Sequence, residues 1–306
     1  MGIVSGLRLA SLFVAYAGVG WTGDSVTRLM AMDDVPSRNV EVDVAVEIDR
    51  RIDRQVRVDV RVDRDGACAV ELDRELTIPL DGATLLAIDA GAGELRVEGV
   101  DGQTEVRAVG RVCASSEALA EGLQVTLDRV GGELRLSAHY PDQAFWGGRN
   151  RTASIDLTVT MPIGTSLDID DSSGEIVVSG SGALDIDDSS GEIFVEAALG
   201  SVRIDDSSGE IEVVGATGDV EIEDGSGEVD VRNVEGSVLI RDGSGSIDVT
   251  GVGRDVRIEV DGSGSIDVRD VAGSFMVARD GSGGIRYENV AGAVDVPEPE
   301  RRGRRN

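Results

Sequence analysis

The feature that most constrains this chain is a repeat of 17 to 19 residues in its carboxyl-terminal half. A period this regular is typical of a solenoid, in which each coil stacks on the one before it. Each unit carries two short segments of alternating apolar residues, such as 238–240 and 247–249. We therefore predict an all-β fold, a β-solenoid of stacked two-strand coils over residues 166–296, preceded by a smaller irregular β region. The repeat is marked by a glycine that follows a serine, at Gly174, Gly191, Gly209, Gly227, Gly245, Gly264 and Gly283.

The apolar positions within one unit distinguish two kinds of coil. Left-handed hexapeptide helices also use coils of about 18 residues, but they need an apolar residue at every sixth position. Here the apolar residues fall at Val238, Ile240, Ile247, Val249 and Val252. This spacing favours a flattened coil that contributes one strand to each of two sheets. Residues 88–102 resemble a divergent earlier copy of the same unit.

The remainder of the chain divides into shorter segments. Residues 40–62 alternate between apolar and charged positions, the period of a β-strand with one buried face. The length exceeds that of an ordinary strand, so we predict a hairpin. Residues 115–122 begin with serine and end with glycine, which predicts a short helix. The predicted organisation is a signal peptide (1–17), a linker (18–39), an alternating β-hairpin (40–65), a lead-in β region (66–165), the β-solenoid (166–296) and a disordered basic tail (297–306).

The amino-terminal segment has the features of an export signal. Arg8 precedes an apolar run over residues 9–14, and the triplet 15–17 has the small-x-small pattern of a signal peptidase site. The run is shorter than the roughly 20 residues that a membrane span needs. An uncleaved anchor or a buried amino-terminal strand are the alternatives. Cleavage would place the protein in the periplasm, in the cell envelope or outside the cell.

The two cysteines, Cys68 and Cys113, fit an exported chain, because a disulfide persists in an oxidising compartment. We predict that they are joined, and two separate buried thiols are the alternative. Two cysteines without a nearby histidine do not make a zinc site.

The net charge of -29 excludes several partners. A chain with 58 acidic and 29 basic residues lacks the basic face that nucleic acid or an anionic membrane requires. Catalysis also finds little support, because the chain has a single histidine, His139, and no phosphate loop or metalloprotease motif. We therefore predict that it is not an enzyme, and we assign it no cofactor other than the candidate Ca²⁺ discussed below. Three aromatic residues, Tyr140, Phe145 and Trp146, cluster in one segment and keep a carbohydrate-active enzyme as the alternative.

A column of aspartates is the strongest chemical feature of the repeats. It comprises Asp171, Asp188, Asp206, Asp224, Asp242, Asp261 and Asp280. An aspartate before Ser-Ser-Gly or Gly-Ser-Gly can accept a backbone N–H two residues on and so form the turn.

The first four coils add two further acids each, which we expect to flank the turn aspartate along one exposed edge. Oxygen-rich carboxylate sites suit Ca²⁺, so cation binding is the second interpretation. The candidate ligands are Asp170, Asp171 and Glu175, Asp187, Asp188 and Glu192, Asp205, Asp206 and Glu210, and Glu223, Asp224 and Glu228.

The run of residues 155–164, followed by repeated Ser-Gly-Glu-Ile and Gly-Ser-Gly-Ser-Ile units, resembles a bacterial β-strand-repeat family. Its members carry the label putative adhesin or domain of unknown function, and the resemblance covers about residues 68–296. It implies an exported or envelope-associated β-solenoid and supplies no catalytic residues. The resulting expectation is a scaffold or adhesion module, stabilised by cations if the acidic edge binds them, whose partner is an envelope or surface protein or a glycan. No transmembrane span is expected after signal cleavage.

Overall fold

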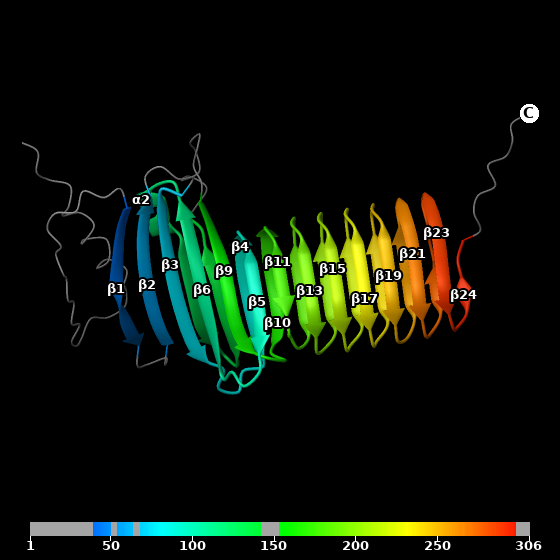
Figure 1. The fold of residues 1–306 in the computed structure, drawn as a ribbon, viewed down its shortest axis with the longest axis horizontal. Coiled ribbons are helices and arrows are strands. Elements are labelled where there is room, and N and C mark those ends of the chain that lie inside the picture. The colour runs from blue at the N-terminus through cyan, green and yellow to red at the C-terminus, as the bar shows by residue number, and fades with distance from the viewer. Residues whose placement is uncertain (1–38, 50–53, 64–67, 142–152, 298–306) are drawn as a thin grey trace, which may run out of the picture.

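Alternation of apolar and polar residues places one strand of every coil in each of two facing sheets. In this computed structural model, residues 39–49, 54–63, 68–141 and 153–297 are described. They form a long rod in which successive coils stack like rungs, from the repeats next to the lead-in region to the last coil (Figure 1). The predicted all-β solenoid of about seven stacked coils, with an irregular β region before it, is confirmed.

Among the described residues, one sheet has thirteen strands and the other eleven, and we call them sheet A and sheet B. Sheet A runs in the order β1 (Asn39–Asp49), β2 (Arg54–Asp63), β3 (Val70–Pro79), β6 (Glu105–Ala114), β9 (Ala153–Pro162), β5 (Leu95–Val100), β11 (Ile176–Ser179), β13 (Ile193–Ala198), β15 (Ile211–Ala216), β17 (Val229–Val234), β19 (Ile247–Val252), β21 (Gly264–Val271) and β23 (Gly283–Val290). Sheet B runs in the order β24 (Val294–Asp295), β22 (Phe275–Val277), β20 (Val256–Asp261), β18 (Val238–Asp242), β16 (Val220–Asp224), β14 (Val202–Asp206), β12 (Leu184–Asp188), β10 (Ser166–Ser173), β4 (Leu85–Ala92), β8 (Glu133–His139) and β7 (Gln124–Val130).

The coils stack in parallel register, so equivalent residues lie directly above one another. Val229 pairs with Ile247 and Val231 with Val249 in sheet A, and the same relation continues through the following coils. The inward residues of both sheets form one continuous apolar core, in which most side chains are less than 5% exposed. Burial of these thin rows is possible only because neighbouring coils cover them, which is why the repeat must stack.

The repeated glycine is required by the distance between coils. A Cβ atom built on Gly227 would lie 1.5 Å from the carbonyl oxygen of Gly209, one coil earlier. On Gly245 the corresponding distance, to the oxygen of Gly227, is 1.4 Å. No side chain fits at this point, so the column is fixed by backbone contact between coils as well as by turn conformation.

The lead-in region covers the amino-terminal end of the stack. Strands β4 and β5 form the divergent extra coil, paired in parallel with β10 and β11. Sheet A continues through β9, β6 and β3 in antiparallel pairs, and the β7–β8 hairpin continues sheet B. Helix α2 (Glu117–Gly122) packs Leu119 and Ala120 inward, and Ser116 caps its amino end.

Strands β1 and β2 pair antiparallel at the outer edge of sheet A, next to β3. The structure joins Cys68 and Cys113 in a disulfide, with their Cα atoms 5.1 Å apart. The predicted signal peptide, nearly all of the linker, the basic tail after Pro297, and Phe145 and Trp146 lie outside the described residues. Among the described residues, no helix combines the length and apolar character needed to cross a membrane.

Candidate functional site

The turn aspartates form a buried column between the two sheets. Asp206 pairs in register with Asp188 on one side and Asp224 on the other, and the column continues in the same way through the repeats. Asp206 is only 2% exposed, and the equivalent aspartates from Asp171 to Asp261 are similarly buried. The expectation that the turn aspartate lies on an exposed edge is therefore wrong. Asp206 lies on the same inward side of β14 as Ile204, so the strand geometry directs its side chain into the rod.

In four of the turn aspartates, one carboxylate oxygen has a clear structural role. The Oδ1 atoms of Asp206, Asp224 and Asp242 accept the backbone N–H two residues on at 3.1, 3.0 and 3.1 Å. Asp188 does the same with Ser190 at 3.3 Å. These are the predicted Asx-turns, and they close each coil at the point where the chain passes from sheet B to sheet A.

The second oxygen of these four aspartates has no donor among the described residues, and in Asp171 and Asp261 neither oxygen has one. The Oδ2 atoms of Asp188, Asp206, Asp224 and Asp242 are buried and receive no hydrogen bond from the described residues. The neighbouring carboxyls of the column act on these groups through their charge, as Asp224 and Asp261 do on Asp242. Repulsion between stacked carboxylates disfavours the ionised form.

Burial and mutual repulsion raise the pKa values of the aspartates in this column. Loss of solvation, reinforced by the charge of Asp188, raises the pKa of Asp171 to about 7. Desolvation likewise raises the pKa of Asp206 to about 6. It raises that of Asp242 to about 7, with the charges of Asp224 and Asp261 adding to the effect. Part of the column therefore carries protons near neutral pH.

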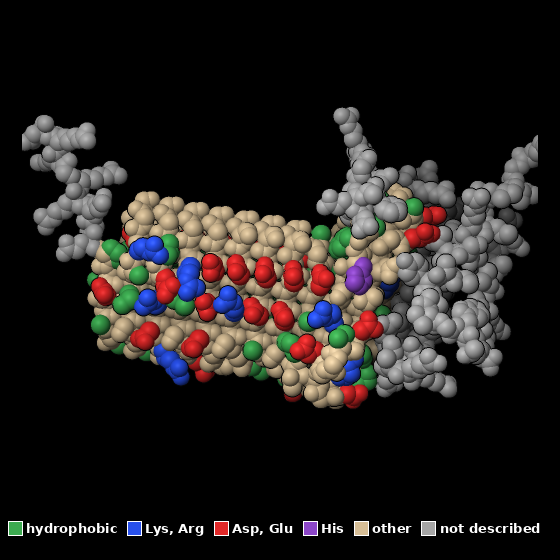
Figure 2. All heavy atoms as spheres, turned by 180° about the vertical axis from the view of Figure 1, so that it is seen from behind, with side chains coloured by type: hydrophobic (Ala, Val, Ile, Leu, Met, Phe, Trp, Pro, Cys, Tyr) green, Lys and Arg blue, Asp and Glu red, His purple; other side chains and the backbone are tan. Residues whose placement is uncertain are grey.

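The other acids of each coil face different directions from the turn aspartate. Asp170, Asp187, Asp205 and Glu223 lie in register on the outer face of sheet B, in one row with Asp89. Figure 2 shows this row as a line of acidic side chains that leads to the histidine. The row ends at Arg241, whose guanidinium lies 3.7 Å from Glu223 and 2.8 Å from Glu259.

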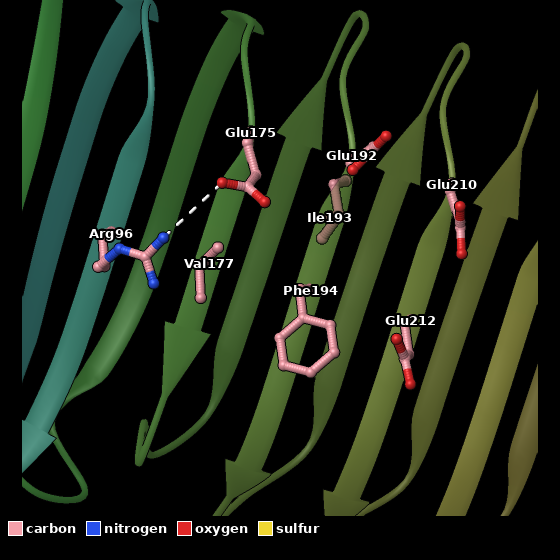
Figure 3. A pocket seen from close by; sticks show the side chains of 8 residues that line it. All are labelled: Arg96, Glu175, Val177, Glu192, Ile193, Phe194, Glu210 and Glu212. Carbon is pink, nitrogen blue, oxygen red and sulfur yellow. Dashed lines mark ion pairs between the residues drawn. The ribbon is translucent and has the colours of Figure 1, made fainter.

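The third acid of each coil lies on the side of sheet A. Glu175, Glu192 and Glu210 line a depression on the outer face of that sheet (Figure 3). The three carboxylates of one coil are therefore separated rather than gathered at one edge. Among the described residues, no three histidine, cysteine or acidic side chains are placed to hold a metal ion.

The depression on sheet A combines apolar and charged side chains. It has a volume of about 310 Å³ and crosses β5, β11, β13 and β15. Val177 and Phe194 form its apolar floor at equivalent positions of neighbouring strands, as Figure 3 shows. Glu192, Glu210 and Glu212 surround them, and Arg96 lies 3.7 Å from Glu175 at one end.

Sequence reasoning missed this site. Phe194 stands apart from the other aromatic residues in the sequence and so gives no cluster to notice. The signal was present in the repeat alignment, because Phe194 takes the outward position that Glu212 and Asp230 occupy in the next coils. The aromatic residue stands out among these acids only when the repeats are aligned.

Tyr140 belongs to the aromatic segment that suggested a carbohydrate groove, but its role is structural. Tyr140, the described member, is partly buried, and its hydroxyl donates to the carbonyl of Ala92. The same oxygen accepts the N–H groups of Ala92 and Ile155 at 3.1 and 3.2 Å. Tyr140 thus ties the first coil to β9. His139 is exposed and its Nε2 lies 3.2 Å from the hydroxyl of Thr126.

Comparison with known proteins gives matches among solved structures only. The sequence matches no family model and no curated protein. The similar solved structures include a putative cell adhesion protein from Clostridium sporogenes and putative adhesins from Bacteroides fragilis and Parabacteroides distasonis.

The identities are 14, 14 and 12% and the TM-scores 0.27, 0.32 and 0.32, over 73, 74 and 74% of this chain and 97% of each of the others. Scores of this size carry no argument about function. The structural neighbours are putative adhesins from several bacteria, the description that the repeat resemblance implied.

Proposed function

We propose that this chain is a non-catalytic, exported interaction module of the cell envelope that binds its partner on the outer face of sheet A. The observation that carries the proposal is the depression in which Phe194 and Val177 lie among glutamates. A regular solenoid repeats the same outward residues from coil to coil, and here the pattern changes from acids to apolar residues over two neighbouring strands. Such a local change on a rigid face is typical of a binding site.

The shape of the site supports binding over catalysis. The side chains of the depression come from successive parallel strands and stand side by side on an open sheet (Figure 3). Acid–base catalysis of glycoside cleavage needs two carboxyls on opposite sides of a scissile bond, one of them with a raised pKa. The aspartates whose pKa is raised to about 6 or 7 lie between the sheets, where a substrate does not reach.

The chemistry of the rim indicates the kind of partner. Glu175, Glu192, Glu210 and Glu212 place negative charge around an apolar floor, and Arg96 supplies one positive charge at the end. A partner with basic groups and an apolar face complements this surface. Amino sugars of envelope glycans and arginine- or lysine-rich segments of surface proteins both have this character.

The binding test uses oligosaccharides of three charge states on the full chain. Titration calorimetry should show the strongest binding with deacetylated chitin oligomers, weaker binding with acetylated chitin oligomers and no binding with heparin fragments. Phe194→Ala should weaken binding at least about tenfold, the loss expected for an aromatic contact. Leu239→Ala is the matched control, because Leu239 faces outward on sheet B. Equal effects of both variants, or turnover of the oligomers, would contradict the proposal.

The proposed export is tested independently. Cells that produce the chain with a carboxyl-terminal tag should release it into the periplasmic or extracellular fraction. Its amino-terminal sequence there should begin at Gly18, the residue after the predicted cleavage site. Recovery of the intact chain in the cytoplasm would contradict export and leave the binding result unaffected.

A further inference from the structure

The carboxyl-terminal coil leaves the end of the apolar core uncovered. Tyr287 and Val294 point along the core rows but are 49% and 36% exposed. One coil earlier, the equivalent residues Val268 and Phe275 are 0% exposed. The ring of Tyr287 lies 6.0 Å from that of Phe275 and covers it only in part.

The backbone at this end is also unpaired. Each inward residue of sheet A directs its N–H toward the next coil, as Val229 does to the carbonyl of Ser246 and Ile211 to that of Glu228. Ile285 stands in register with Val229 through the intervening coils, and β23 is the last strand of sheet A among the described residues. Ile285 and Tyr287 therefore present hydrogen-bonding groups along a free edge.

The two ends of the rod differ. At the amino-terminal end, β8 and β9 pair with β4 and β5 and cover the first coil. At the carboxyl-terminal end, no described strand pairs with the outer edge of β23, and Tyr287 and Val294 remain exposed. The first coil is thus covered by the lead-in strands, whereas the last described coil keeps an apolar surface and an open sheet edge.

The side chains of β23 make this edge complementary to itself. In an antiparallel pair centred on Tyr287, Arg286 of each chain stands opposite Glu288 of the other. The outward-facing charges then form two opposite-charge pairs, while the two Tyr287 residues meet on the core side. A shift of the centre to Arg286 would place like charges opposite each other.

We propose that two copies of this chain associate through their carboxyl-terminal ends, with the β23 strands paired antiparallel about a two-fold axis at Tyr287. The contact joins the two A sheets into one and covers both exposed core ends. Because the contact is isologous, each copy uses its β23 edge once and association stops at a dimer.

Charge exchange on the full chain tests this register. Sedimentation equilibrium over a concentration series should show a monomer–dimer equilibrium for the wild-type chain. Arg286→Glu and Glu288→Arg should each weaken the dimer by at least about tenfold, because like charges then oppose each other twice. A mixture of the two variants should recover a heterodimer, since each then supplies the charge that the other needs. Arg203→Glu, an exposed position on sheet B, is the control and should leave the dimer unchanged.

A cross-linking variant provides a second reading. Tyr287→Cys should give a disulfide-linked dimer under mild oxidation, because the two positions meet on the axis. Asp205→Cys, exposed on the outer face of sheet B, should not. A wild-type chain that remains monomeric at every concentration, a larger open assembly, or a dimer insensitive to both charge variants would overturn the proposal.

Discussion

Four turn aspartates combine a repeated hydrogen bond to the backbone with a buried oxygen that has no hydrogen-bond donor. Oδ1 of Asp206 holds the N–H of Ser208 at 3.1 Å, while its Oδ2 is buried without a donor. An ionised carboxylate in that position is costly, because removal from water favours the neutral form. Burial and repulsion between neighbouring carboxyls raise the pKa values of the column, so its contribution to stability depends on pH.

The pH dependence follows from the direction of the shift. Burial raises the pKa of Asp206 from 3.8 to about 6, so the folded chain retains a proton that the unfolded chain has already lost. The stabilisation that this proton provides is complete below pH 3.8 and is lost as the pH rises through about 6. The pKa values of Asp171 and Asp242, about 7, extend the same loss toward neutrality.

The first prediction is that Asp206→Asn stabilises the rod at alkaline pH. The amide keeps an oxygen for the N–H of Ser208 and cannot ionise, so the free energy of unfolding at pH 8 should rise by about 1–3 kcal/mol. Urea unfolding at pH 5 and pH 8 measures the change, which should be smaller at pH 5. Asp205→Asn is the matched control, because Asp205 is exposed on the same strand. A similar gain from both variants would attribute the effect to net charge alone.

The position of these aspartates could have been predicted from the sequence. Leu167, Ile169 and Asp171 share one parity along β10, so the alternation that buries the first two also buries the third. An aspartate is expected to face solvent because it is charged, but the alternation along the strand buries it here. The depression around Phe194 was harder to predict, because it depends on which residues of different coils become neighbours.

The distance between successive coils is set by backbone contact at the glycine column. We predict that Gly227→Ala destabilises the stack by about 3 kcal/mol or more, because its methyl group would overlap the carbonyl of Gly209 and force two coils apart. Thermal unfolding measures the loss. Gly132→Ala is the control, since a Cβ atom there meets nothing within 4 Å. A small effect at Gly227 would mean that neighbouring coils can separate at little cost.

The disulfide is the corresponding constraint in the lead-in region. Cys68 and Cys113 close a loop of 45 residues that includes β3, β4 and β5. We predict that the Cys68→Ser, Cys113→Ser variant loses roughly 3–4 kcal/mol of stability relative to the oxidised chain, as loop-closure entropy requires. Denaturant unfolding measures the loss. Two free thiols in the denatured, unreduced native protein would contradict the pairing.

The elements differ in how far their arrangement could be predicted. The repeat period determined the two-strand coils of 166–296, because each unit contains its own alternation and its own turn. The order of β3, β6, β9 and β5 in sheet A could not be derived in the same way. These strands pair over long sequence separations and without a period, so the sequence around any one of them does not specify its neighbours.

The whole rod carries its charge in separate rows. Acids face outward on both sheets and inward along the turn column, and arginines are interleaved among the outer rows. Arg203 lies 3.8 Å from Asp185 and 3.7 Å from Glu221, and Arg241 lies 3.0 Å from Glu221. Exposed pairs of this kind contribute little individually, but they reduce repulsion between stacked coils that are in strict register. The net charge of -29 is thus distributed so that the coils can still stack.

This distribution determines how the rod should respond to cations. The expectation of divalent sites required three carboxylates of a coil to converge, whereas Asp205, Asp206 and Glu210 face outward on sheet B, inward, and outward on sheet A. We therefore predict that cations act by screening, which weakens repulsion between exposed rows over about 10 Å at 0.1 M ionic strength. Thermal unfolding in millimolar CaCl₂ and in NaCl of equal ionic strength should give the same midpoint, and both midpoints should exceed that in low salt. A larger shift with calcium that disappears in Asp187→Asn or Asp205→Asn would instead show ions bridging the outer row of sheet B.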